Sequence, residues 1–199
     1  MAKYKKVIRK RGREYYRIKL CGLVRDLPLF EVNPGVKIAI FNTLGDTEIV
    51  KKLGATLARR LPKDSQVIVT PEVKSIPLAY ELSRRMKIPY VVTRKIKKPY
   101  MVGSIGHQTR TYTHQSKSQT IWLDGKDKNI LKGKKVVLID DVISTGSTLA
   151  ALRSLMKKAK AKVVAETAVF TEGDPKKWKS IISLGNLPVF INQEKNTNE

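Results

Sequence analysis

The sequence predicts an α/β fold with a mostly parallel central sheet flanked by helices. Segments 65–70, 75–86 and 88–95 have the patterns of strand, helix and strand, which is a β-α-β unit with parallel strands and a right-handed crossover. Segment 134–141, KKVVLIDD, is apolar on both faces, as expected of a central strand. A further helix-like and strand-like pair follows it, so the alternation continues toward the C-terminus.

The elements before this unit are a basic N-terminal part, a strand and a helix. Residues 1–20 hold nine Lys or Arg and a single Glu, and we expect the first dozen to form an arm. The stretch YYRIKL (15–20) alternates like a strand, and VKIAIF (36–41) is a second strand. Residues 47–61 have apolar side chains at helical spacing, and Asp46 or Thr47 is the expected N-cap.

The elements within and after the unit follow from composition and spacing. SQVIVT (65–70) is β-branched, and 75–86 becomes helical after its proline. Residues 96–118 have no stable period and many Gly, Ser and Thr, which predicts a long functional or mobile loop. The remaining elements are expected at 118–124 (strand), 134–141 (strand), 147–159 (helix) and 162–170 (strand). Residues 192–199 form a polar tail.

The composition limits the classes of protein. A chain of 199 residues suits one larger domain. The net charge of +23 creates a positive field that attracts anions, either nucleic acid or phosphorylated metabolites. The alternative interpretation is that the many Lys residues serve only to keep the protein soluble. One cysteine, Cys21, excludes an internal disulfide and fits a reducing cytoplasm. Neither a membrane span nor a secretory signal is recognisable, so we expect a cytoplasmic protein with no membrane partner.

Two adjacent carboxylates, Asp140 and Asp141, end the most apolar strand. Adjacent carboxylates repel each other and resist burial, so a ligand is a better explanation than a turn cap alone. Carboxylates accept hydrogen bonds from the vicinal hydroxyls of a sugar and help to hold Mg²⁺. We therefore expect these residues to face a polyhydroxylated or metal-bound ligand.

The segment after the carboxylates is typical of a phosphate site. Its side chains are small, a glycine permits a tight turn, and a helix begins at once. Exposed amides and the positive end of a helix bind phosphate. The expected contacts come from Ser144, Thr145, Gly146, Ser147 and Thr148. One site would then hold a sugar through its hydroxyls and its 5′-phosphate.

This motif resembles that of a known family. VVLIDDVISTGSTL (136–149) is similar to the phosphoribosyl-pyrophosphate (PRPP) motif of type I phosphoribosyltransferases, with Ser147 where a second glycine is common. TPEVKSIPLAYELSRRMKIPYVVTRK (70–95) resembles the pyrophosphate-loop region of the purine branch. The resemblance implies the type I phosphoribosyltransferase fold with a small N-terminal hood and a flexible loop. We divide the chain into an arm and hood segment (1–34), a core (35–191) and the tail (192–199).

The resemblance also implies roles for residues outside the motif. In the family the pyrophosphate loop often contains a non-proline cis peptide, and its amides bind pyrophosphate. The matching positions are Glu72, Val73, Lys74 and Ser75 in the loop and Arg94 and Lys95 after the next strand. Residues 96–118, including Lys98, correspond to the flexible loop that closes over PRPP, although the Glu common in adenine enzymes is missing. The resemblance further implies a Mg²⁺ cofactor, associated with Asp140 and Asp141 directly or through PRPP, and a homodimer.

The acceptor base is expected to be a purine. GLVRDLPLF (22–30) resembles a stretch of adenine phosphoribosyltransferases that reads the base, with Val24 replacing a phenylalanine. This implies base contacts from Leu23, Val24 and Arg25, with Phe170 and the turn that it begins, Phe170–Glu172, on the other side of the base. Adenine is the leading acceptor, and hypoxanthine, guanine and xanthine are the alternatives.

The expected reaction joins a purine base to PRPP and releases pyrophosphate. The resemblance assigns the catalytic roles to Asp140, Asp141, Lys74 and Arg94. A rival hypothesis is a PRPP-binding regulator without turnover, because the bacterial purine repressor uses the same fold to sense PRPP. The positive charge would suit nucleic acid, but too few residues precede the core for an appended winged-helix domain, so this partner is not favoured.

Overall fold

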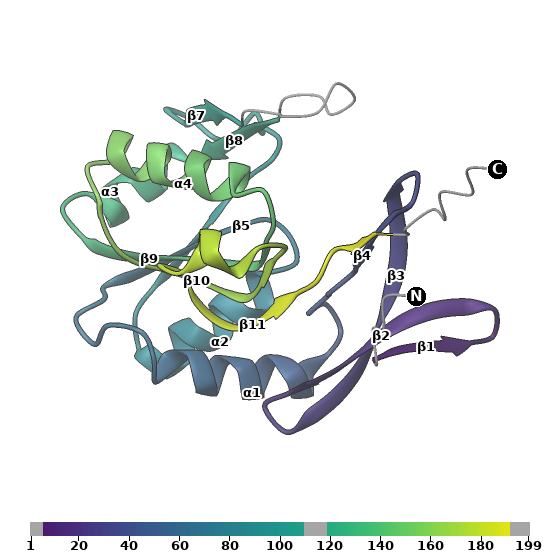
Figure 1. Cartoon of the computed structure of the whole chain (residues 1–199). Coiled ribbons are helices and arrows are strands. Elements are labelled where there is room, and N and C mark those ends of the chain that lie inside the picture. Colours follow the sequence, from purple (N-terminus) through teal and green to yellow (C-terminus); the bar gives the residue numbers. More distant parts are fainter. Residues whose placement is uncertain (1–5, 110–118, 192–199) are drawn as a thin grey trace.

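The central sheet is parallel, as the sequence predicts. The computed structural model describes residues 6–109 and 119–191. Its larger unit is a parallel sheet with the strand order β11-β10-β9-β5-β6 (Figure 1). Its strands are β5 (Val67–Pro71), β6 (Tyr90–Thr93), β9 (Lys135–Ile143), β10 (Lys162–Glu172) and β11 (Ile182–Leu187).

Helices cover both faces of this sheet. One face carries α1 (Thr47–Ala58) and α2 (Ile76–Met86), and the other carries α3 (Gly125–Leu131) and α4 (Ser147–Lys158) (Figure 1). The alternation of β9 supplies both cores, with Val137 and Ile139 on the α1 side and Val136 and Leu138 on the α4 side. This explains why the segment is apolar at every position before its carboxylates.

A second, antiparallel sheet projects from the core, and we call it the hood (Figure 1). Its strands lie in the order β1-β2-β3-β4-β12. They are β1 (Val7–Lys10), β2 (Arg13–Leu20), β3 (Leu23–Asn33), β4 (Val36–Ala39) and β12 (Phe190–Ile191). The hood therefore includes β4 and β12, which lie within the 35–191 segment that the sequence analysis assigned to the core.

Two smaller elements complete the description. The hairpin β7 (Ile105–Gln108) and β8 (Thr120–Leu123) is joined to the core where Arg94 and Trp122 exchange backbone hydrogen bonds of 2.8 and 2.7 Å. A 3₁₀ helix, η1 (Pro175–Trp178), follows β10. No helix of the described ranges is long and apolar enough to cross a membrane.

Several expected elements differ from the structure. The first dozen residues were expected to be an arm, but residues 7–10 form a strand, because Val7 and Ile8 pair with Tyr16 and Tyr15 across a tight turn. All of the segment 22–30 except Gly22 belongs to the 11-residue strand β3. The expected loop 96–118 contains β7 in its described part, and residues 110–118 lie outside the described residues, as does the predicted tail. The sequence analysis did not identify α3 or β11.

Candidate active site at the carboxyl edge of the parallel sheet

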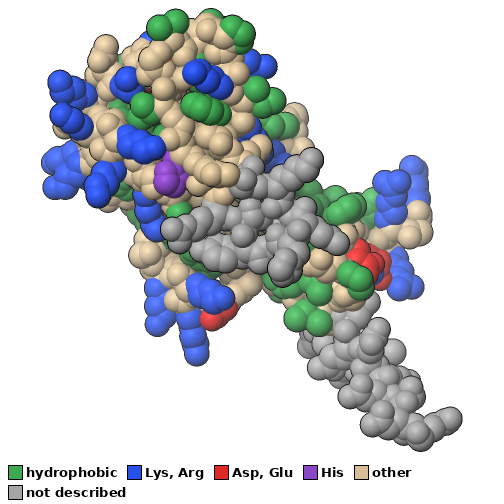
Figure 2. Space-filling model, turned by 90° about the horizontal axis from the view of Figure 1, so that it is seen from above, with side chains coloured by type: hydrophobic (Ala, Val, Ile, Leu, Met, Phe, Trp, Pro, Cys, Tyr) green, Lys and Arg blue, Asp and Glu red, His purple; other side chains and the backbone are tan. Residues whose placement is uncertain are grey.

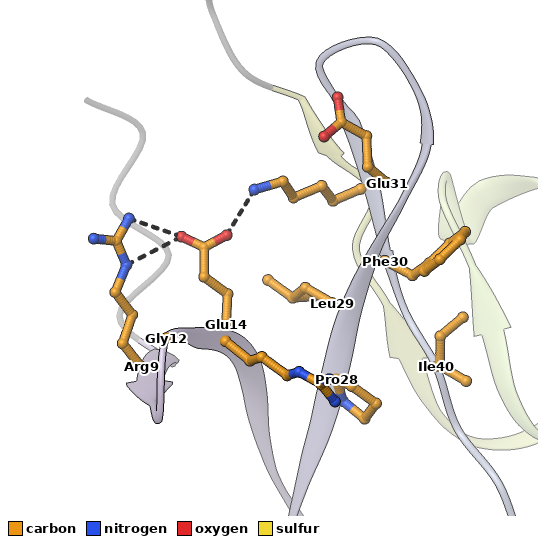
Figure 3. A pocket seen from close by; sticks show the side chains of 10 residues that line it. Arg9, Gly12, Glu14, Pro28, Leu29, Phe30, Glu31 and Ile40 are labelled. Atoms are coloured by element: carbon orange, nitrogen blue, oxygen red, sulfur yellow. Dashed lines mark hydrogen bonds and ion pairs between the residues drawn. The ribbon is translucent and has the colours of Figure 1, made fainter.

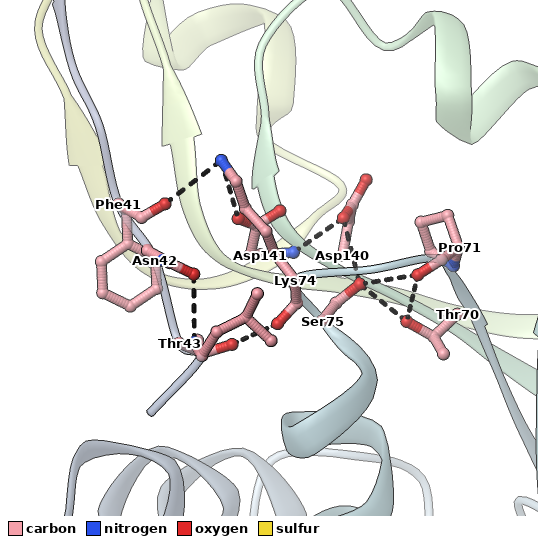
Figure 4. A network of polar contacts seen from close by, with 10 residues as sticks. Phe41, Asn42, Thr43, Thr70, Pro71, Lys74, Ser75, Asp140 and Asp141 are labelled. Atoms are coloured by element: carbon pink, nitrogen blue, oxygen red, sulfur yellow. Dashed lines mark hydrogen bonds and ion pairs between the residues drawn. The ribbon is translucent and has the colours of Figure 1, made fainter. Parts of the chain in front are cut away.

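Three predicted loops meet at one edge of the core. They are the turn after β5 (71–75), the start of the predicted loop 95–118 after β6, and the end of β9 with the start of α4 (140–148). Carboxyl ends of parallel strands share an edge of the sheet, which brings these segments together although they are far apart in the sequence. The contacts between the first and third of them are drawn in Figure 4.

The two adjacent carboxylates point to opposite sides of β9 and contact different residues. Asp141, 9% exposed, has Oδ2 3.8 Å from Lys74 Nζ. Asp140 Oδ1 accepts hydrogen bonds from Ser75 Oγ at 3.3 Å and from the Asp141 amide at 2.9 Å (Figure 4). Burial, and secondarily the charge of Asp141, raise the pKa of Asp140 to about 8. A carboxylate with a raised pKa at a strand end is a candidate ligand-binding group.

Lys74 is held above the edge by residues from another segment. The Thr43 hydroxyl donates to the Lys74 carbonyl, and Lys74 Nζ lies 3.5 Å from the Phe41 carbonyl oxygen (Figure 4). The side chain keeps 45% of its surface exposed. An ammonium group anchored by its backbone and open to solvent can reach an anionic ligand.

Glu72, Arg94 and Lys95 form one connected group. Arg94 Nε lies 3.0 Å from Glu72 Oε2, and the Lys95 amide donates to Glu72 Oε1 at 2.5 Å. The Glu72–Val73 peptide bond is cis. The carboxylate of Glu72 thus joins the turn after β5 to the end of β6, while the side chain of Val73 remains 54% exposed.

The predicted phosphate loop surrounds a small cavity at the start of α4. Residues 140 and 142–149 line a space of about 100 Å³. Gly146 has φ +79°, a conformation that favours glycine. A second cavity of about 440 Å³ lies on the other side of this loop, between it and the strand β7, and includes His107. The loop is therefore accessible to a ligand from the edge of the sheet.

The predicted base contacts are not gathered into one cluster. Leu23 and Phe170 are core side chains, 9% and 3% exposed, and the Phe170 ring lies edge-on to Phe41 with centroids 5.0 Å apart. Val24 is 51% exposed. Arg25 binds Asp46 and Glu48 at the start of α1, at 2.6 and 2.9 Å. Of these residues, only Val24 has a largely exposed side chain.

Lys98 lies further along the segment after β6. Its amide donates to Met101 Sδ, with 3.3 Å between the nitrogen and the sulfur, and its carbonyl accepts from the Met101 amide at 3.0 Å. No described contact joins the Lys98 side chain to Asp140 or Asp141. Its neighbour Lys97 instead stacks on the Trp122 ring, with Nζ 5.4 Å from the centroid.

Two residues at the site, Thr43 and Trp178, were not predicted from the sequence, and Glu172 was expected only as the end of a turn beside the base. Thr43 is 1% exposed and fixes Lys74, as described above. Glu172, 8% exposed, accepts a hydrogen bond from Ser144, and Trp178 covers Gly146. The sequence signal that could have pointed to them was their place after a strand. Thr43 follows the predicted strand 36–41, and Glu172 ends the strand next to β9 in the sheet.

Another cavity lies away from this edge. It occupies about 790 Å³ in the hood, between the β1–β2 hairpin and strands β3 and β4 (Figure 3). Two of its cations are already paired, since Arg9 and Lys37 both bind Glu14, at 3.0 and 2.7 Å. Lys and Arg side chains dominate the charged surface of the face seen in Figure 2, which agrees with the net charge of +23.

Comparison with known proteins identifies relatives. A family model described as "phosphoribosyl transferase domain" matches residues 42–185. The hypoxanthine/guanine phosphoribosyltransferase of Methanocella paludicola is 36% identical over 139 residues, which are 69% of this chain and 67% of that protein. The enzyme of the same name from Methanococcus voltae is 34% identical over 65% of this chain and 65% of its own length. The matched stretch thus spans about two thirds of these relatives.

Solved structures agree in fold. The adenine phosphoribosyltransferase of Thermoanaerobacter pseudethanolicus has a TM-score of 0.66 with 21% identity, covering 80% of this chain and 95% of that one. The enzyme from Saccharomyces cerevisiae, complexed with an imino-altritol bisphosphate and adenine, has a TM-score of 0.61 with 18% identity, covering 85% and 93%. At these identities the likeness concerns the fold.

Proposed function

The chain belongs to the phosphoribosyltransferase family, and we propose that it transfers the phosphoribosyl group of PRPP to a purine base and releases pyrophosphate. One observation carries this proposal. The pair Asp140–Asp141, the loop 144–148 and the anchored Lys74 lie at one edge of the sheet, so a sugar with phosphates at both ends can contact all three.

In this proposal the core binds PRPP. Asp140 and Asp141 accept hydrogen bonds from the two ribose hydroxyls. The amides of residues 144–148 and the hydroxyls of Thr145, Ser147 and Thr148 bind the 5′-phosphate at the start of α4, where the helix dipole favours an anion. The turn from Glu72 to Ser75, with Lys74, Arg94 and Lys95, binds the pyrophosphate. Lys98 stays a predicted PRPP contact.

The proposed chemistry breaks the bond between C1 of the ribose and the pyrophosphate oxygen, and the electron pair of this bond leaves with pyrophosphate. A bond forms from C1 to a base nitrogen, which releases its proton to water. Negative charge grows on the departing oxygen as positive charge grows on the ring. Lys74 and the amides of residues 73–75 stabilise the first charge, and the carboxylate of Asp141, together with that of Asp140 once it has lost its proton, favours the second. Orientation of the two substrates supplies the remaining acceleration, without a covalent intermediate.

The carboxylates fit a magnesium ion that is bound mainly by substrate. Within the described residues, no group of three or more His, Cys, Asp or Glu side chains could form a closed metal site. Mg²⁺ commonly binds through one or two carboxylates, waters and substrate phosphates, which Asp140 and Asp141 could provide directly or through the ribose hydroxyls. When bound, Mg²⁺ neutralises charge on the pyrophosphate leaving group.

Two classes of purine compete as the acceptor. Adenine is the prediction from the stretch 22–30, and hypoxanthine and guanine are the bases in the names of the relatives at 34–36% identity. The structural neighbours carry the name of adenine enzymes, but their identity is 21% or less. The sequence relatives therefore favour hypoxanthine or guanine, and a base panel separates the two classes.

We also propose a homodimer formed through the edge of the core sheet. The outermost strand, β6, carries Tyr90, whose ring meets that of Tyr80 at 6.3 Å. Tyr80 and the nearby Tyr100 are 57% and 68% exposed. Exposed aromatic side chains of this kind are typical of protein interfaces. Sedimentation of the wild-type chain and of Tyr90→Asp tests this proposal, and a monomeric wild type would reject it. The cytoplasmic location stays a prediction.

The decisive test of function is turnover with each base. The purified chain is incubated with PRPP, Mg²⁺ and adenine, hypoxanthine, guanine, xanthine or orotate, and nucleotide and pyrophosphate are measured. We expect nucleotide from at least one purine and none from orotate. PRPP binding without turnover on any base would instead support the regulator hypothesis, and absence of PRPP binding would reject both.

A further inference from the structure

The loop 144–148 has little support of its own. Thr145 Oγ1 donates to Ser147 Oγ at 3.1 Å, and the Ser147 amide donates to Thr145 Oγ1 at 3.3 Å. The N-cap of α4 is Gly146, which has no side chain to bind the first amides of the helix. The shape of the loop therefore depends on residues outside it.

Glu172, the last residue of β10, provides the first outside contact. Its Oε1 accepts a hydrogen bond from Ser144 Oγ at 2.5 Å, and the residue is only 8% exposed. A hydroxyl has one proton, so Ser144 cannot donate to a phosphate while it donates to Glu172. A nearly enclosed carboxylate also needs such a partner. The bond thus fixes the start of the loop to β10.

Trp178, the last residue of η1, provides the second contact. Its indole Nε1 donates to the Glu172 carbonyl at 3.1 Å. Its ring lies against Gly146 so closely that a Cβ there would be 2.8 Å from Trp178 Cη2. The ring therefore occupies the space beside the turn of the loop, and the same two residues that contact the loop also contact each other.

From these contacts we propose that Glu172 and Trp178 are positioning residues, which hold the loop 144–148 in the shape that binds the 5′-phosphate of PRPP. This inference rests on the proposed function. The Glu172 side chain contacts the loop, and the Trp178 side chain contacts the loop, the Glu172 carbonyl and the core on the α4 side of the sheet. No described hydrogen bond or ion pair joins either side chain to Asp140, Asp141 or Lys74. Without Glu172 and Trp178 the free loop would be less ordered, and PRPP would have to order it on binding. The KM for PRPP should therefore rise, while kcat changes less.

The test compares truncated and conservative variants in the whole chain. Trp178→Ala and Glu172→Ala should each raise the KM and the Kd for PRPP by about tenfold or more. Trp178→Phe keeps a ring and Glu172→Gln keeps an acceptor oxygen, so both should raise them only about threefold. Glu166→Gln is the matched control, because Glu166 lies on the same strand but pairs with Arg153, and its KM should equal that of the wild type.

A spectroscopic signal gives a second readout. The chain has two tryptophans, so Trp122→Phe leaves Trp178 as the only indole. Its emission should change when ribose 5-phosphate or PRPP is added, because the ring touches the loop that binds the phosphate. Unchanged emission at concentrations where calorimetry detects binding would contradict the inference.

The outcomes separate the inference from the function on which it rests. A wild type that binds no PRPP overturns both. A wild type that binds PRPP, together with folded alanine variants whose KM stays within about twofold, overturns the inference alone. If thermal unfolding shows that the alanine variants do not fold, Trp178→Phe and Glu172→Gln decide, and an unchanged KM in both overturns the inference.

Discussion

The carboxyl groups of the hood sheet and of the core sheet have pKa values shifted in opposite directions. In the hood, Glu14 is bound by Lys37 and Arg9, and Asp26 by Arg17 and Lys10, and these partners lower the pKa of both carboxyl groups. At the edge of the core, burial and a neighbouring carboxylate raise the pKa of Asp140. Carboxylates that pair with cations stabilise the fold. A buried carboxylate without a close cation destabilises the fold, and its oxygen atoms are available to bind a ligand.

The two sheets also differ in what covers them. All five residues of β5 are buried, because helices pack on both faces of the core. The hood buries Leu23 and Leu27 of β3 on one face, while Val24 and Phe30 of the same strand are 51% and 62% exposed. A strand packed on both faces holds its terminal residues in fixed positions, which suits groups that must bind a sugar and its phosphates together. The strands of the hood have one exposed face, so fewer neighbouring side chains fix the positions of their residues.

The largest effect should come from removing the core carboxylates. Asp140→Asn/Asp141→Asn is expected to lower kcat/KM by at least about 100-fold, because two charge-assisted hydrogen bonds to the ribose are lost. Calorimetry with PRPP and steady-state rates measure this loss. The hood double variant Glu14→Gln/Asp26→Asn is the control and should bind PRPP normally. An equal loss of kcat/KM in the two variants would show that the core carboxylates are no more important for PRPP binding than those of the hood.

The second effect concerns packing. Leu138→Ala, at a fully buried position of β9, should lower the free energy of unfolding by about 2–5 kcal/mol, because it leaves a cavity between the sheet and α4. Phe30→Ala on the bare face of the hood should change it by no more than about 0.5 kcal/mol. Urea unfolding followed by circular dichroism measures both. A large loss for Phe30→Ala would mean that this face is covered in solution.

The third effect is pH dependence of stability. Because the pKa of Asp140 is raised on folding, the native state holds a proton that the unfolded state has released, and wild-type stability falls as pH rises toward about 8. Asp140→Asn lacks this loss, so its melting temperature should exceed that of the wild type by a margin that grows from about pH 5 to about pH 9. Thermal unfolding over this range, without ligand, measures the margin, and a constant or shrinking margin would refute the assignment.

The smallest effect tests how the hood is attached to the core. Arg25→Ala removes the ion pairs from β3 to Asp46 and Glu48 and should cost about 1 kcal/mol of unfolding free energy. Amide exchange in β3 should accelerate at the same time. Arg9→Ala, whose side chain is 81% exposed, is the control and should cost less. Identical exchange rates in β3 of the wild type and the Arg25 variant would show that the hood does not need this attachment.

The sequence was more informative for the core than for the hood. Strands buried on both faces leave continuous apolar runs, so the existence of β5, β6 and β9 and of the polar loops after them could be predicted. The ends were less exact, because β6 ends at Thr93 and not at 95, and β9 ends at Ile143 and not at 141. In the hood, Lys and Arg occupy exposed alternate positions of β2, and the pairing of β1 depends on a turn with positive φ at Arg11 and Gly12, which the expected basic arm did not anticipate. The contacts of Glu172 and Trp178 with the loop 144–148 could not be predicted, because their partners lie 28 and 32 positions away and only the parallel pairing of β9 and β10 brings them together.

The pairing of β12 with β4 has a consequence for how this chain is made. Phe190 packs edge-on against Tyr16 with ring centroids 5.2 Å apart, and Ile191 pairs with Val36. During synthesis on the ribosome, the sheet of the first strands to emerge therefore stays incomplete until residues 190 and 191 have been translated. The segments translated in between can fold first, so the earliest part of the chain is among the last to reach its final form.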